Sequence, residues 1–305
     1  MNRFRIPITV IVALSASLLV VSFSSSVSPS HVKEAGGPAA DNDEYLEAAV
    51  QRESSPSLSQ AAKRNSLLRT DLKWGFGSKQ QRGWYLYTPL ISRLIDTRHS
   101  PASNGFAAAV ARWQKKSGLP PSGVLDDQTL YKMIAEWQGK RIKDRTPALP
   151  GQLFTAPIAD FYDPTREEEL LKVERSTYAA YRRLVAAAIA ERSLGLARGA
   201  KKGELAHGEK YLKIISSLRT REYQEKLRRE SPNSGSAGLA VNSPHFTGRA
   251  LDLYVGGEPV DTLDSNRAVQ VQTRVYLWLV RNAERFGFRP YFYEPWHWEY
   301  VGEKC

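Results

Sequence analysis

The sequence predicts an α+β fold, in which a small, mostly antiparallel sheet with flanking helices follows a small three-helix domain. Two stretches of the second half, residues 167–194 and 266–286, repeat apolar residues at helical spacing. Short apolar and aromatic runs with strand character alternate with them, at residues 211–218, 249–255, 288–293 and 297–301. The first half instead concentrates its aromatic residues around two short amphipathic helices.

The N-terminus has the order of a secretory signal. Arg3 and Arg5 precede the apolar residues 6–23, and small polar residues follow up to position 30. The apolar run is also just long enough to cross a bilayer, so residues 1–30 are either a cleaved signal peptide or an uncleaved signal anchor. The arginines before the run predict that the remainder of the chain is exported.

The net charge and the cysteine count limit the kinds of binding partner and metal site that the protein can have. The formal net charge of +11 favours polyanionic surroundings, such as nucleic acid, an anionic cell wall or a membrane surface. No nucleic-acid-binding motif accompanies the charge, so we predict no nucleic-acid partner. The single cysteine, Cys305, excludes an internal disulfide and a zinc site made of cysteines.

Residues 31–66 are polar and alanine-rich and predict a flexible tether, and residues 67–140 predict the helical domain. Its first clear helix begins near Asn104, and a second begins at Asp126 or Asp127 after a glycine- and proline-containing break. The runs G-F-A-A-A-V-A-R-W-Q-K-K-S-G-L, from position 105, and G-V-L-D-D-Q-T-L, from position 123, resemble the peptidoglycan-binding domains of many wall hydrolases. The resemblance implies peptidoglycan as a partner, although residues 96–101 depart from the glycine-rich segment of that family.

Residues 141–165 contain four prolines and predict a linker, so we expect the first domain to act as a tethered module. Residues 166–305 form the second predicted domain. Its expected elements are one long helix at 167–194, a strand at 211–218, a short charged helix at 220–230, a glycine- and serine-rich loop at 231–242, a strand at 249–255, a long helix at 266–286 closed by Gly287, and two aromatic strands at 288–293 and 297–301.

Asp252 is the first residue of the second domain that suggests chemistry. It lies inside an apolar strand, where an unpaired carboxylate would be costly to bury, and a metal ion is an adequate partner. His245 lies just upstream, across a turn that Gly248 permits. A His and an Asp this close are also commonly a hydrogen-bonded structural pair.

Glu294 and His297 strengthen the metal hypothesis. Catalytic zinc is usually bound by three nitrogen or oxygen ligands and one water, and His245, Asp252 and His297 would supply the three. Glu294 would remain as the acceptor of the proton of the water. The alternative is that the aromatic segment around His297 is simply core.

Three segments resemble the VanY-type D-alanyl-D-alanine carboxypeptidases, which are zinc peptidases with a Hedgehog-like fold. They are S-S-L-R-T-R-E-Y-Q at 216–224, S-P-H-F-T-G-R-A-L-D at 243–252 and E-P-W-H-W-E-Y-V-G at 294–302. The resemblance implies His245, Asp252 and His297 as ligands of one Zn²⁺ and Glu294 as the general base. It implies Arg219 as a catalytic and substrate-binding cation that holds either the scissile carbonyl or the substrate carboxylate. It implies only pocket lining for Ser243 and Gln224. Ser217 and Leu218 replace the glycine and tyrosine of the family beside Arg219.

We therefore predict an exported zinc metallopeptidase that hydrolyses peptidoglycan stem peptides and releases C-terminal D-alanine. It would act in the periplasm or cell wall, either free or anchored in the membrane through residues 6–23. Two alternatives stay open: a zinc endopeptidase cutting within stem peptides or cross-links, and a non-catalytic muropeptide-binding protein.

Overall fold

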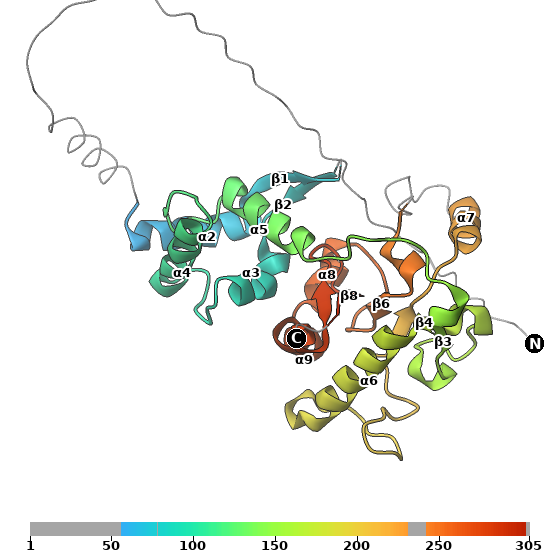
Figure 1. The fold of residues 1–305 in the computed structure, drawn as a ribbon. Coiled ribbons are helices and arrows are strands. Elements are labelled where there is room, and N and C mark those ends of the chain that lie inside the picture. Colours follow the sequence, from blue (N-terminus) through green and yellow to red (C-terminus); the bar gives the residue numbers. More distant parts are fainter. Residues whose placement is uncertain (1–55, 78, 231–241, 303–305) are drawn as a thin grey trace, which may run out of the picture.

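The computed structural model describes residues 56–77, 79–230 and 242–302, and it confirms the α+β class (Figure 1). The proposed signal, the tether up to residue 55 and most of the loop 231–242 lie outside the described residues. Among the described residues, no helix combines the length and the apolar composition that crossing a membrane requires.

The first domain contains helices α2 (Leu58–Asp71), α3 (Thr88–Leu94), α4 (Asn104–Lys116) and α5 (Asp127–Gly139) and the hairpin β1 (Lys73–Phe76)–β2 (Lys79–Arg82). Ser103 and Asp126 cap α4 and α5 with their side chains. Helix α2 begins inside the segment predicted to be a tether. The buried side chain of Asn65 explains why this helix is fixed, because it bonds the carbonyl of Gly123 and the N–H of Leu125.

The second domain is built on a four-stranded antiparallel sheet in the order β5 (Ile214–Ser216), β6 (Ala250–Leu253), β8 (His297–Tyr300) and β7 (Phe288–Pro290). Helices α6 (Arg175–Ala190) and α9 (Arg274–Asn282) add buried aromatic residues to its core. Tyr181 of α6 donates a hydrogen bond to the carbonyl of Leu212, and Tyr276 of α9 packs its ring on Trp298.

Both long helices predicted from periodicity are interrupted. The first is replaced by η4 (Glu168–Leu171), β4 (Lys172–Glu174) and α6, and the second by α8 (Asp264–Gln270), α9 and η8 (Ala283–Phe286). The reason is a side-chain cap inside each stretch. Glu174 accepts from the backbone of α6, and Thr273 accepts from the backbone of α9, so a new helix begins at each position. Gly287 ends the second stretch as predicted, with φ of +80°.

The two domains share one hydrophobic core. Phe292, in the turn between β7 and β8, packs on Phe76, Tyr87 and Trp137 of the first domain, at ring-centroid distances of 4.8, 5.4 and 6.0 Å. Arg267 of α8 is 1% exposed, and it donates across the same boundary to the Tyr87 hydroxyl and within the second domain to the Tyr293 carbonyl. The first domain is therefore docked on the second and does not have the contacts of a freely tethered module.

The proline-rich segment 141–165 is also ordered against the second domain. Its strand β3 (Leu153–Thr155) pairs with β4, and the N–H of Ala148 donates to the carbonyl of Phe246. At its start, Arg141 and the buried Ile142 both bond to Glu299 of β8. The connection between the domains thus runs along the edge of the candidate site.

Candidate metal centre

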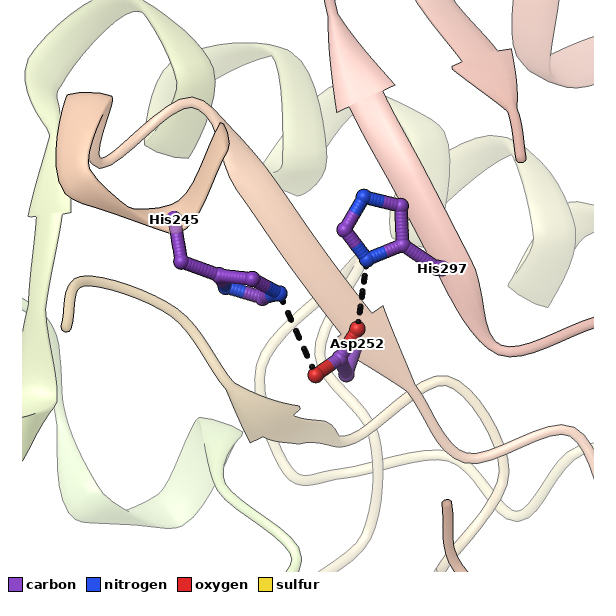
Figure 2. A group of neighbouring side chains, drawn as sticks. All are labelled: His245, Asp252 and His297. Carbon is purple, nitrogen blue, oxygen red and sulfur yellow. Dashed lines mark hydrogen bonds and ion pairs between the residues drawn. The ribbon is translucent and has the colours of Figure 1, made fainter. Parts of the chain in front are cut away.

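Three predicted ligands converge in the second domain. Asp252 on β6 and His297 on β8 are directly opposite each other in the sheet. His245 lies on η7 (Pro244–Thr247), which Gly248 ends with φ of +64° before the chain turns into β6. Donor atoms of the three residues lie within 4.8 Å of one another, and all three residues are buried. Figure 2 shows both imidazole rings directed at the carboxylate.

The carboxylate of Asp252 lies between the two rings. Its Oδ2 is 3.3 Å from Nε2 of His245, and its Oδ1 is 2.9 Å from Nδ1 of His297. The ring centroids are 4.9 Å apart and nearly perpendicular. Two imidazole nitrogens and a carboxylate therefore face one small volume.

The outer nitrogen of each ring has its own acceptor. Nδ1 of His245 lies 2.7 Å from the carbonyl oxygen of Ser217, and Nε2 of His297 lies 3.2 Å from Oε1 of Glu299. A neutral imidazole that donates from its outer nitrogen has a lone pair on its inner nitrogen. Ligand histidines in metal sites have this arrangement, so the three residues could hold a metal ion.

The surroundings shift the pKa values of the two histidines in opposite directions. Burial, with the charge of Arg219, lowers the pKa of His245 to about 4. Burial opposes charge on His297 as well, but its hydrogen bonds to Asp252 and Glu299 raise its pKa to about 9. Although burial disfavours its charge, contacts with His245, His297 and Arg219 hold the pKa of Asp252 well below its usual range. The site thus favours an ionised carboxylate beside positive charge.

Glu294 and Arg219 flank the cluster. Oε2 of Glu294 is 3.9 Å from Nδ1 of His297, and burial raises the pKa of Glu294 to about 7 against the attraction of His297. Arg219 donates from Nη2 to Oδ2 of Asp252 at 2.8 Å and from Nε to Oγ of Ser216 at 3.0 Å. The structure therefore brings a largely buried carboxyl group and a cation next to the three predicted ligands.

The two residues predicted to line the pocket, Ser243 and Gln224, are both buried, and neither is among the residues that line the cavity beside Arg219. Oγ of Ser243 accepts from the N–H of His245, so Ser243 caps the short helix that carries this predicted ligand. Gln224, on α7 (Arg221–Glu230), is 4% exposed, and its Oε1 has no hydrogen-bond partner among the described residues. A cavity of about 490 Å³ opens beside Arg219, between residues 147–155 and Phe246.

Glu299 is the residue that the sequence analysis missed. It is fully buried on β8, two positions after His297, and accepts hydrogen bonds from His297, Arg141 and the backbone of Ile142. Burial opposes its charge, but the hydrogen bond from His297 and the charge of Arg141 lower its pKa to about 2. One signal was present in the sequence: Glu299 follows the predicted ligand His297 by two positions in a predicted strand, so the two side chains share a face of the sheet.

Comparison with known families agrees with the motifs. Residues 171–303 match the family model VanY, described as D-alanyl-D-alanine carboxypeptidase, and residues 93–133 match a model described as putative peptidoglycan binding domain. A search of curated proteins found no match. The chain therefore carries a VanY-type domain, which contains the whole cluster, and a peptidoglycan-binding-type domain. Together they indicate a cell-wall peptidase.

Proposed function

We propose that the protein is an exported, zinc-dependent D-alanyl-D-alanine carboxypeptidase that removes the terminal D-alanine from peptidoglycan stem peptides. The observation that carries the proposal is the convergence of His245, Asp252 and His297 on one buried point with Glu294 beside it. Two nitrogens and one carboxylate are a common protein donor set of catalytic zinc. The VanY match and the basic, apolar start of the sequence support the reaction and the export, respectively.

The donor set fits one zinc ion, with Nε2 of His245, a carboxylate oxygen of Asp252 and Nδ1 of His297 as ligands. Zinc in such a set polarises the scissile carbonyl and makes a bound water easier to deprotonate. In the proposal, Glu294 takes a proton from the attacking water and returns it to the leaving amine of D-alanine. Burial raises the pKa of Glu294, and this direction suits a carboxyl group that accepts a proton and later returns it.

Arg219 is proposed to bind the substrate. A guanidinium can hold both oxygens of a carboxylate, and a carboxypeptidase must recognise the C-terminal carboxylate of its substrate. The same charge could stabilise the developing oxyanion. Ser216 and Asp252 fix the position of Arg219, and the adjoining cavity, which Arg219 lines, offers room for the stem peptide.

We further propose that residues 1–30 direct export and that residues 67–140 hold the enzyme on the wall. The match to a peptidoglycan-binding model supports the second assignment. In this proposal the connecting segment 141–165 and the peptidase domain 166–305 keep their predicted boundaries. The binding domain is extended to include α2, which shortens the predicted tether.

Mass spectrometry of muropeptides tests the proposal. The purified protein, supplied with zinc, should shorten pentapeptide stems by one alanine, and the Glu294→Gln variant should not. Release of larger fragments would identify an endopeptidase. Stoichiometric zinc binding without any hydrolysis would identify a non-catalytic muropeptide binder and refute the proposed reaction.

A further inference from the structure

Glu299 is a buried charge that the proposed reaction does not use. It follows His297 by two positions on β8, so both side chains lie on the same face of the sheet. Its side chain is 0% exposed. A carboxylate at such a position is costly unless every oxygen has a partner.

Both oxygens of Glu299 are occupied by groups from two parts of the fold. Oε1 accepts from Nε2 of His297 at 3.2 Å and from Nε of Arg141 at 2.8 Å, with a second contact from Nη2 of Arg141. Oε2 accepts from the N–H of Ile142 at 2.9 Å. The carboxylate therefore joins the outer nitrogen of a proposed ligand to the start of the connecting segment.

Arg141, like Glu299, has several contacts that fix its side chain. Its Nη1 donates to Oε1 of Gln138 in α5 at 2.9 Å, and its guanidinium lies 4.0 Å from the ring centroid of Tyr291. The Tyr291 ring in turn contacts His297 at a centroid distance of 5.8 Å. These contacts limit the orientation of Arg141 and hence that of the Glu299 carboxylate.

The hydrogen bond to Glu299 determines which ring nitrogen of His297 carries the lone pair. While Nε2 donates its hydrogen to Glu299, the lone pair of the neutral ring is on Nδ1, which faces Asp252 and His245. Residues in this outer position orient ligand histidines, and their loss typically weakens metal binding by roughly 10- to 100-fold.

We propose that Glu299, held by Arg141, is a positioning residue that makes Nδ1 of His297 the metal-binding nitrogen. The inference rests on the proposed zinc site. It assigns a function to the contact between the start of the connecting segment and the sheet, because the segment supplies both Arg141 and the N–H of Ile142.

The test is the zinc affinity of Glu299→Gln in the full-length protein, measured by competition with a chromophoric chelator. Gln keeps the shape and an oxygen acceptor but loses the charge, and we expect the Kd for zinc to rise by roughly 10- to 100-fold. Glu284→Gln is the matched control. Glu284 pairs with Arg289 of the neighbouring strand β7 at 2.7 Å, so this change removes an ion pair on the same sheet, and its zinc Kd should stay at the wild-type value.

Proton NMR of the zinc-loaded protein separates positioning from simple support. The Nε2–H of His297 bonds a carboxylate in the wild type and should resonate at low field, and it should move upfield in Glu299→Gln. If Glu299 only neutralises Arg141, this resonance will stay in place. The double variant Glu299→Gln/Arg141→Gln leaves no unpaired buried charge, and it should show both effects even if the single variant does not fold.

The outcomes distinguish this inference from the proposed function. A wild-type protein that binds no zinc would overturn the proposed metal site itself. Zinc binding by the wild type with an equal Kd in a folded Glu299→Gln or double variant would overturn the positioning role and leave the metal site standing.

Discussion

Phe292→Ala tests whether the two domains unfold as one unit. Phe292 is 2% exposed and lies two positions before Glu294. Its ring contacts Phe76 of β1, Tyr87 of the short helix η1 (Tyr85–Tyr87) and Trp137 of α5, all in the first domain. Removing the ring therefore leaves a cavity between the domains directly behind the turn that carries the proposed base.

The size of the effect follows from this burial. Truncation of a core Phe to Ala costs about 3–5 kcal/mol, and the three cross-domain ring contacts place Phe292 near the middle of that range. In a domain of 150–250 residues each kcal/mol lowers the unfolding midpoint by about 2–4 °C. We therefore expect a drop of about 8–16 °C, with lower turnover because Glu294 loses its support.

Thermal unfolding followed by circular dichroism and by tryptophan fluorescence measures the effect. Phe286→Ala is the control, because Phe286 is half-buried and stacks on Trp278 within the second domain. Its midpoint should fall less. The reasoning would be refuted by a Phe292→Ala midpoint within about 2 °C of the wild type, or by two separate wild-type transitions of which the variant shifts only one.

Three further predictions concern the site. His245→Ala and His297→Ala should each lose zinc and activity together, as metal analysis of the folded proteins will show; full zinc content would remove either residue from the ligand set. Glu294→Gln should keep zinc but lower turnover by a factor on the order of 100 or more, and near-normal turnover would exclude it as the base. Arg219→Lys keeps the charge but loses the fork that contacts Ser216 and Asp252, so KM for stem peptides should rise while zinc stays bound; an unchanged KM would place substrate recognition elsewhere.

The convergence of His245, Asp252 and His297 could be predicted because local sequence restricts the position of each residue. Asp252 is a charge inside an apolar strand, and Gly248 turns the chain between it and His245. Glu294 and His297 lie three positions apart across a tight turn, where the N–H of His297 donates to the carbonyl of Glu294. The short spacing within each motif and the cost of burying the charge of Asp252 together leave few other arrangements of these side chains.

The contacts that sequence reasoning missed join distant parts of the chain. Arg141 and Glu299 are separated by 158 positions, so no local pattern in the sequence indicates that they pair. Helix α2 was missed for another reason. Its buried side chains are Ala61, Ala62 and Asn65, so it carries too little apolar surface to give a periodic signal.

The order of strands in the sheet has a consequence for folding. Asp252 and His297 are neighbours across β6 and β8 but lie 45 positions apart, with α8 and α9 between them. The loop-closure entropy of this connection must be overcome before the pairing of the strands can repay it, so contacts of this kind form late. An ion that needs both residues would bind the native state and none of its precursors, and its binding would then favour the finished fold by mass action.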